Sequence, residues 1–308
     1  MAWGEPGPLS GCVPRAPLEG PLSIGKLPSR GLTRIFAKTT FGAPFPPPPE
    51  HTPMAAQLPP HSPEEAILLV AGTGSRLRPL TADRPKCLLE VGGQALLKRL
   101  LDQLAEVGIK RAVLVTGYLH ERMVETVASW SLGLDVAFAP NPTFDTENNA
   151  ISTLVGMREL KGRSFLLCDG DILLRQTTWV ADLLRDEREN VLTMIRFDTL
   201  GHEEMKIRLG HREAIEGLSK GLDPASAHGE SLGVQKVGPS AFSTLIERLS
   251  SLNDEERVRL YYEDVFAELI PEGIKFFARE VQPGSWTEID TAEDLQMARE
   301  LYQSWSEV

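Results

Sequence analysis

The spacing of hydrophobic residues in the first half of the folded part alternates between two periods. Short runs rich in Val, Ile and Leu at 66–71, 112–116 and 164–168 are typical of strands that are buried on both faces. Between the first two, the leucines of residues 94–107 recur every three or four positions, which predicts a helix that ends at Gly108. Further helices are expected over 120–129 and 150–160, and a strand over 134–139. This alternation predicts a parallel, doubly wound sheet.

The pattern changes after residue 190. Strands are expected at close spacing over 191–197, 205–209, 213–219 and 231–237, which suggests antiparallel additions to the same sheet. Helices over 239–250, 261–269 and 292–302 and a strand over 275–281 complete the prediction. The expected fold class is therefore α/β, with a mixed, mostly parallel sheet flanked by helices.

The first 63 residues show no sustained period and hold 15 of the 23 prolines. We expect a disordered, proline-rich extension over 1–63 and one folded domain over 64–308. A targeting peptide is an alternative, because Arg15, Arg30 and Arg34 accompany several serines, but an apolar core with a cleavage site is lacking. Another alternative is that Met54 is the true start.

Charge, apolar runs and cysteine content indicate which partners and which compartment to expect. The formal net charge is −11, and an acidic body argues against general binding to nucleic acid, since phosphates would repel it. No run approaches 18 apolar residues, so we expect no membrane partner. Three cysteines at unpaired spacings favour a reducing compartment, and a cytoplasmic location is expected.

The candidate chemistry begins where the first strand ends. Ala71 leads into Gly72-Thr73-Gly74-Ser75-Arg76, and Lys86 follows ten residues later, directly behind Pro85. Glycines allow positive φ and let backbone N–H groups converge on an anion, so this stretch is expected to hold phosphate. It is not a P-loop, because no Gly-Lys-Ser/Thr follows, and it lacks the third glycine of a dinucleotide fingerprint.

Acidic residues follow a later strand and precede the last helix. The strand over 164–168 delivers Asp169-Gly170-Asp171, and Asp290 lies just before the helix over 292–302. Carboxylates at the end of a buried strand are costly unless they meet a cation, and Mg²⁺ prefers one or two carboxylates plus substrate phosphates. Asp171 and Asp290 are therefore the expected Mg²⁺ ligands. The alternative is that each acid only caps a neighbouring turn or helix.

These sequence segments together resemble the sugar-phosphate nucleotidyltransferase superfamily, whose signature is Gly-x-Gly-x-Arg-Leu-x-Pro-Leu-Thr followed by Pro-Lys and two apolar residues. Here it is carried by Gly72, Gly74, Arg76, Leu77, Pro79, Leu80, Thr81, Pro85, Lys86, Leu88 and Leu89. Asn148-Asn149 with Ser152, Asp169-Gly170-Asp171-Ile172 and the run from Trp286 to Asp294 look most like the phosphocholine and phosphonate cytidylyltransferases. The resemblance covers roughly residues 65–303. It implies a single Rossmann-like domain of the nucleotide-diphospho-sugar transferase type.

The resemblance and the residue patterns together assign roles. Catalytic roles fall to Arg76, Lys86 and Lys206. Nucleotide binding is expected from Ala71, Gly72, Gly74, Ser75, Tyr118, Asn148, Asn149 and Asp169. Acceptor binding is expected from Glu204, Lys220, Tyr261, Tyr262 and Glu263. Simpler roles stay open: an asparagine before a helix can be only a cap, the two later lysines can be solvated, and tyrosines on a helix are often core residues.

The implied activity is Mg²⁺-dependent transfer of CMP from CTP to a small phosphorylated acceptor, with release of pyrophosphate. Relatives that use phosphocholine hold the quaternary ammonium with aromatic rings and acids. Near Lys206, where a tryptophan is expected, this chain has Glu204 or Met205, which suits a primary amine better. A sugar-1-phosphate or inositol-1-phosphate nucleotidyltransferase and an inactive nucleotide-binding regulatory subunit are the alternatives. A homodimer is left open.

Overall fold

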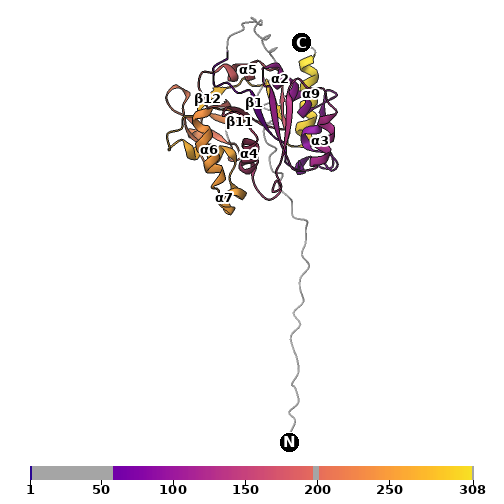
Figure 1. The fold of residues 1–308 in the computed structure, drawn as a ribbon, viewed down its shortest axis with the longest axis horizontal. Helices are drawn as coiled ribbons and strands as arrows, with labels where there is room; N and C mark the ends of the chain where they lie inside the picture. Colours follow the sequence, from indigo (N-terminus) through magenta and orange to yellow (C-terminus); the bar gives the residue numbers. More distant parts are fainter. Residues whose placement is uncertain (2–57, 197–200, 307–308) are drawn as a thin grey trace, which may run out of the picture.

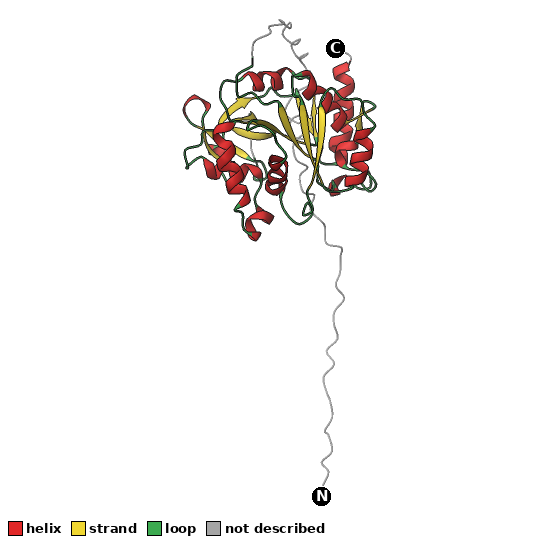
Figure 2. Cartoon of the chain, in the orientation of Figure 1, coloured by secondary structure: helices red, strands yellow, loops and turns green. Residues whose placement is uncertain are grey.

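The computed structural model describes residue 1 and residues 58–196 and 201–306, shown in Figures 1 and 2. The extension predicted over 1–63 lies almost wholly outside the described residues, as does residue 197 at the end of one predicted strand. Within the described part, nine strands form one sheet, and its central strands run in the order β11-β6-β1-β4-β5.

The parallel part of this sheet contains the strands that the sequence predicts best. β1 pairs in parallel with both β4 and β6, and β4 pairs in parallel with β5. Their bounds are Glu65–Leu69 for β1, Arg111–Thr116 for β4, Asp135–Pro140 for β5 and Phe165–Asp169 for β6. Because the carboxyl ends of parallel strands meet at one edge, the segments that follow β1 and β6 lie together there.

The later strands extend the sheet mainly by antiparallel pairing. β11 lies against β6, β8 and β9, all antiparallel, and β9 pairs with β10, while β12 runs parallel to β8. Their bounds are Val191–Ile195 for β8, Lys206–Leu209 for β9, Ile215–Ser219 for β10, Gly229–Val237 for β11 and Phe277–Glu280 for β12. The mixed sheet predicted from the sequence is therefore confirmed.

Alternating residues of β1 and β4 enter two different cores. Ile67 and Val113 pack with helices α4, α6 and α8 on one face, whereas Leu68 and Leu114 pack with α2, α3 and α5 on the other. The first group of helices spans Asn149–Arg158, Pro239–Ser250 and Tyr262–Leu269, and the short α7 spans Asp254–Arg259. The second group spans Leu96–Glu106, His120–Ala128 and Thr178–Arg185. Figure 1 shows α6 and α7 at the lower left with α4 beside them near the middle, and α3 at the right.

Two short ribbons lie outside the main sheet. β7 (Ile172–Leu174) pairs antiparallel with β13 (Trp286–Glu288), and β2 (Glu90–Val91) pairs with β3 (Gln94–Ala95). The C-terminal helix α9 (Ala292–Ser306) helps to close a third core beneath them, in which Leu295 and Ala298 meet Leu77 and Leu173. The sequence predicts neither ribbon, and β3 occupies the first two positions of the helix predicted over 94–107.

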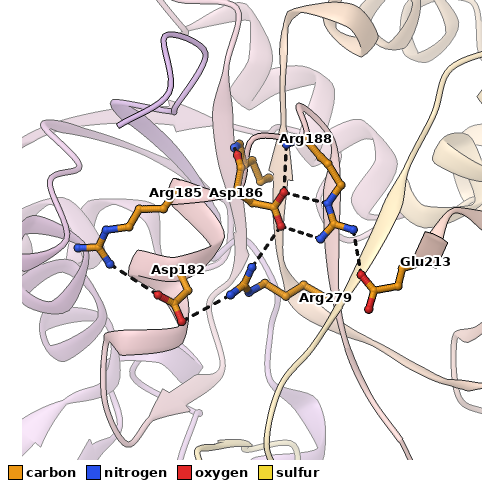
Figure 3. A network of polar contacts seen from close by, with 7 residues as sticks. Asp182, Arg185, Asp186, Arg188, Glu213 and Arg279 are labelled. Carbon is orange, nitrogen blue, oxygen red and sulfur yellow. Dashed lines mark hydrogen bonds and ion pairs between the residues drawn. The ribbon is translucent and has the colours of Figure 1, made fainter. Parts of the chain in front are cut away.

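A charged network fixes the end of α5 against the neighbouring strands. In Figure 3, the carboxylate of Asp186 lies between the guanidinium groups of Arg188 and Arg279. Arg188 Nη2 is 2.6 Å and Arg279 Nη1 is 3.2 Å from Asp186 Oδ2, and Arg188 also meets Glu213 at 3.0 Å. The network joins the α5–β8 connection to β12, on the part of the molecule that bears the antiparallel strands.

Candidate active site

The glycine turn after β1 has the backbone that its sequence requires. Gly74 has φ 58° and ψ 37°, in the left-handed region that favours glycine, and a short 3₁₀ turn over Ser75–Leu77 follows it. A Cβ on Gly74 would lie 3.0 Å from the Lys86 Cβ and 3.1 Å from the Thr81 Cγ2. The fully buried Thr81 also donates a hydrogen bond from Oγ1 to the Gly74 carbonyl oxygen, at 2.8 Å. Thr81 and Lys86 therefore pack directly on this turn.

Three carboxylates converge beside the turn, carried by β6 and by the β7–β13 ribbon. Asp171 follows β6, Glu288 ends β13, and Asp290 comes two residues later. The ribbon sets their register, since Glu288 pairs with Ile172 and the Ile289 N–H donates to the Asp171 carbonyl oxygen at 3.0 Å. One carboxylate oxygen from each of the three acids lies within 4.8 Å of the others. Such a group can hold a metal ion.

Two cations from the glycine-turn segment meet these acids. Lys86 Nζ lies 2.7 Å from Asp171 Oδ2 and 2.7 Å from Asp290 Oδ1. Arg76 Nη1 lies 3.1 Å from Asp290 Oδ2, although half of the Arg76 side chain is exposed. The structure therefore brings Lys86, Arg76, Asp171 and Asp290 together, although Arg76 and Asp290 are 214 positions apart in the sequence.

The electrostatics of the cluster follow from this crowding. Burial disfavours the Lys86 ammonium, but its attraction to Asp171, Asp290 and Glu288 outweighs burial and raises the pKa of Lys86. Burial, together with repulsion from Asp171 and Asp290, raises the pKa of Glu288 well above its ordinary range. A cation that binds among the three acids would therefore stabilise their charged forms.

A cavity of about 240 Å³ opens between the turn and the acids. Of the residues that the sequence assigns to the site, the lining includes Gly72, Gly74, Ser75, Arg76, Lys86, Asp171 and Asp290. Ala71 is buried just before the turn, and its carbonyl oxygen accepts a hydrogen bond from the Tyr118 N–H at 3.0 Å. Tyr118 is held by its hydroxyl as well, which donates to the carbonyl oxygens of Thr81 and Ala82 at 3.0 and 2.9 Å.

The two predicted asparagines join α4 to the helices beside it. The Asn148 side chain caps α4 by accepting from the Asn149 N–H, and its amide donates to the Arg259 carbonyl oxygen at 3.2 Å. Asn149 Oδ1 accepts from the Tyr262 N–H at 3.0 Å. These contacts fit the simpler capping role that the sequence left open, and the nucleotide contact stays a prediction.

The predicted acceptor residues divide into two places. Tyr262 is fully buried, and its hydroxyl donates to Asp169 Oδ2 at 3.4 Å, so its ring is a core residue. Glu263 is buried next to it, and burial raises its pKa to about 7. The pKa of Asp169 is also raised, first by burial and then by the charges of Asp171 and Glu263. Lys220 Nζ lies 3.9 Å from the centroid of the Tyr261 ring, which forms a cation–π contact.

Lys206 and its neighbour Glu204 lie at the start of β9. Lys206 is completely buried, and its ammonium donates to the carbonyl oxygens of Gly201 and Glu204, both at 3.0 Å. These bonds to its own loop give Lys206 a structural role, and it does not line the cavity at the glycine turn. Its catalytic role therefore stays a prediction that these contacts do not support.

Sequence reasoning missed three residues of this site. Glu288 was noted only as part of the run from Trp286 to Asp294, although its spacing of two from Asp290 on one strand end was a usable signal. Thr81 was noted only as a signature position, and nothing local shows that it bonds to Gly74. Cys87 lines the cavity with its thiol buried, and burial raises its pKa to about 12, so the thiol is a packing group.

Comparisons with known proteins give the family of this chain. A family model described as "MobA-like NTP transferase domain" matches residues 66–230, which is more than half of the chain. The chain belongs to this family. The matched segment contains the glycine turn, Lys86 and Asp171, while Glu288 and Asp290 lie beyond it.

Individual relatives of this chain include enzymes that transfer nucleotides. A CMP-5'-(3-aminopropyl)phosphonate synthase of Streptomyces rubellomurinus is 36% identical over 111 residues, which cover 36% of this chain but 18% of the synthase. The UTP–glucose-1-phosphate uridylyltransferase AglF of Haloferax volcanii is 29% identical over 168 residues, or 53% of this chain and 67% of AglF.

Solved structures confirm the nucleotide-diphospho-sugar transferase type of fold that was expected. The CTP:phosphocholine cytidylyltransferase LicC of Streptococcus pneumoniae superposes with a TM-score of 0.64 and 24% identity, covering 77% of this chain and 98% of that one. The inositol-1-phosphate CTP transferase of T. maritima gives a TM-score of 0.66 and 23% identity, with coverage of 80% and 97%. At these identities the likeness concerns the fold alone.

Proposed function

We propose that this NTP transferase is a Mg²⁺-dependent cytidylyltransferase, which transfers CMP from CTP to a small phosphoalcohol or aminoalkylphosphonate and releases pyrophosphate. The observation that carries the proposal is the convergence of Asp171, Glu288 and Asp290, of which Asp171 and Asp290 line the cavity at the glycine turn beside Lys86 and Arg76. Carboxylate oxygens within one ion's reach are the donors that Mg²⁺ prefers, so the residues present fit this metal.

The residues of the chain would then bind and orient two phosphorylated substrates. Backbone N–H groups of residues 72–75 and the Arg76 guanidinium would hold the β- and γ-phosphates of the nucleotide. Lys86 would neutralise the charge that develops at the α-phosphate or on the acceptor. When bound by Asp171, Glu288 and Asp290, Mg²⁺ supplies charge neutralisation at the reacting phosphates.

The acceptor oxygen that attacks the α-phosphorus belongs to a phosphate or phosphonate and is already anionic. The P–O bond to pyrophosphate breaks as the new bond forms, and no proton has to be removed from the nucleophile. A general base is therefore unnecessary, and the chain contributes position and charge. This requirement agrees with a cavity whose ionisable lining consists of paired acids and cations.

Two observations favour an acceptor with a positively charged group. One is the similarity to an enzyme whose name specifies an aminopropylphosphonate product. The other is the pair of acids Asp169 and Glu263: burial raises the pKa of both carboxyl groups, and a nearby cation would favour their charged forms. An amino group on the acceptor would supply that cation, and a phosphate at its other end would face Lys86.

A sugar-1-phosphate or inositol-1-phosphate nucleotidyltransferase is the second candidate. It is favoured by the longer match to the Haloferax uridylyltransferase, which spans 168 residues of this chain. A catalytically inactive nucleotide-binding subunit would need no cluster of three acids. The retention of Asp171, Glu288 and Asp290 in one place therefore argues against it.

Pyrophosphate release tests the proposal directly. The purified chain is incubated with Mg²⁺ and each of the four NTPs, in combination with phosphocholine, phosphoethanolamine, 2-aminoethylphosphonate, inositol-1-phosphate or glucose-1-phosphate. We expect release with CTP and an amino-containing acceptor. Release with UTP or GTP and the sugar phosphate would support the second candidate, and CTP binding in calorimetry without turnover on any acceptor would support the inactive subunit.

A further inference from the structure

Lys86 bridges two of the three acids that could share a metal ion. Its Nζ lies 2.7 Å from Oδ2 of Asp171 and 2.7 Å from Oδ1 of Asp290, and both of these oxygens belong to the acids that can hold a metal. The side chains around it are shielded, with 16% of Lys86, 22% of Asp171 and 6% of Asp290 exposed. The ammonium is therefore a bridging cation and not a surface ion pair.

A metal and this ammonium cannot bridge the same oxygens together. Mg²⁺ binds carboxylate oxygen at about 2.0–2.1 Å and demands near-octahedral geometry, so it would displace an ammonium that bridges the same two carboxylates. The cations would also repel each other strongly at such a separation. Arg76 adds a weaker obstacle at Asp290 Oδ2, because its side chain is 53% exposed and free to turn into solvent.

We propose that Lys86 competes with the divalent metal for Asp171 and Asp290, so that the metal binds tightly only when nucleotide phosphates draw the Lys86 ammonium away from the acids. This inference rests on the proposed function, since it assigns the same acids to the metal. It adds that metal and nucleotide bind cooperatively. The nucleotide phosphates draw Lys86 away from the acids and so open them to the metal, and the metal takes the acids and so frees Lys86 for the phosphates.

The structure shows why the ammonium can make this exchange over a short path. Lys86 Cβ would lie only 3.0 Å from a Cβ placed on Gly74, so the base of the side chain packs on the turn that is expected to hold the phosphates. The same cavity is lined by the turn, by Lys86 and by both acids. A rotation of the Lys86 side chain within this cavity therefore suffices to move Nζ from the carboxylates toward a bound phosphate.

The test measures metal binding by the full-length protein without nucleotide or turnover. Mn²⁺ is titrated into the wild type and the Lys86→Met variant, and free Mn²⁺ is followed by its electron paramagnetic resonance signal. If Lys86 holds the acids in about nine of ten molecules, removing it raises the apparent Mn²⁺ affinity about tenfold. Lys98→Met is the matched control, since Lys98 pairs with Asp102 on α2 and not with the acid cluster. We expect the control to match the wild type.

Further variants keep the test decisive. Adding Asp171→Asn to Lys86→Met must abolish the gain in affinity, because the metal then loses a ligand. If Lys86→Met does not fold without metal, Lys86→Gln replaces it, and the increase in Tm on adding Mn²⁺ must exceed that of the wild type. A site damaged by the substitution would bind Mn²⁺ more weakly. Tighter Mn²⁺ binding therefore cannot be explained by structural damage.

Two negative results have different meanings. Equal Mn²⁺ affinity in the wild type and in Lys86→Met or Lys86→Gln would overturn the competition and leave the cytidylyltransferase proposal standing. Absence of Mn²⁺ binding to every variant, with CTP present as well, would overturn the metal assignment and thus both proposals.

Discussion

Asp171 and Glu288 belong to one cluster of acids, but their environments predict different consequences of replacing them. The Asp171 side chain is 22% exposed and pairs with Lys86, whereas the pKa of Glu288 is raised well above its ordinary range by burial and by the two neighbouring aspartates. Asp171 is therefore held in an ion pair, and Glu288 favours its neutral form. When Asn or Gln replaces an acid, its amide resembles the neutral carboxyl group but cannot carry the negative charge of the carboxylate.

The first prediction concerns Asp171→Asn. We expect the variant to fold with a normal circular dichroism spectrum and to lose about 10²–10³ in the rate of pyrophosphate release, or about 3–4 kcal/mol, because a pre-organised charge at the reacting phosphates is removed. Asp102→Asn on α2 is the control, since Asp102 pairs with Lys98 away from the site. A folded Asp171→Asn variant with near-normal turnover would contradict the assignment.

The second prediction concerns Glu288→Gln. Because the neutral glutamine resembles the protonated carboxyl group that burial favours, we expect the Tm at pH 7 to stay the same or to rise. The affinity for Mn²⁺ should nevertheless fall about 10–100-fold, as for the loss of a group that supports a metal. Differential scanning fluorimetry and Mn²⁺ titration measure both. A lowered Tm with unchanged Mn²⁺ affinity would make Glu288 a structural residue.

At the scale of elements, α4 and α8 are held to each other where they approach the site. Asn149, at the first turn of α4, accepts a hydrogen bond from the backbone of Tyr262 at the first turn of α8. The Tyr262 hydroxyl in turn reaches Asp169 at the end of β6. The asparagine therefore sets the position of the residues expected to bind the acceptor.

The third prediction follows from this link. Asn149→Ala leaves the Tyr262 N–H without its acceptor, which should lower the free energy of unfolding by about 1–3 kcal/mol. We expect KM to rise for the acceptor and to stay unchanged for CTP, both measured by pyrophosphate release. A rise in the KM for CTP alone would instead support the nucleotide contact expected from the sequence.

The fourth prediction concerns the network in Figure 3, which joins the α5–β8 connection to β12. Burial opposes the Asp186 charge, but hydrogen bonds and attraction from Arg188 and Arg279 outweigh burial and lower its pKa to about 2. A lowered pKa in the folded state stabilises the fold above the ordinary pKa of about 4, and this contribution disappears as the pH falls toward 2.

Asp186→Asn should therefore cost about 2 kcal/mol at pH 7 in urea unfolding, and the difference from the wild type should shrink below pH 4. Asp182→Asn is the control, because Asp182 is 52% exposed and its ion pairs are worth about 1 kcal/mol or less. A cost for Asp186→Asn that is independent of pH would show that charge does not cause it.

The sequence predicts the elements whose signal is local and misses those that depend on distant partners. β1 and β6 are buried apolar runs, and the leucine spacing of α2 is strong, so their positions follow from the period alone. β7 and β13 are three residues each and pair across more than 100 positions, so neither has a period that can be recognised. That is why the sequence does not place Glu288 beside Asp171, and why Asn149 cannot be told from a helix cap.

At the scale of the whole molecule, the described residues 58–196 and 201–306 contain every residue assigned to the site and all three cores. They contain no helix with the length and apolar content needed to span a membrane. The first described residues also attach to the fold, since Ser62 Oγ donates to the Leu184 carbonyl oxygen at 2.7 Å.

The fifth prediction is that a chain beginning at Met54 retains the Tm and the rate of pyrophosphate release of the full chain. The reason is that the residues which build the cavity and the cores all lie after residue 57. A chain beginning at Pro63 is the comparison, and it should have a lower Tm because it lacks the hydrogen bond of Ser62. Loss of pyrophosphate release in the chain that begins at Met54 would assign a role to residues 1–53.

The β7–β13 ribbon has a consequence for the chain while it is being translated. Two of the three acids in the cluster, Glu288 and Asp290, are carried by or follow β13, and they come 117 and 119 positions after Asp171 in the sequence. A nascent chain that has emerged from the ribosome only as far as residue 280 already contains the glycine turn, Lys86 and Asp171. It lacks the other two acids, so it meets cellular nucleotides with an incomplete cluster. The acid cluster is therefore complete only after residue 290 has emerged, just before the helix that helps to close the third core.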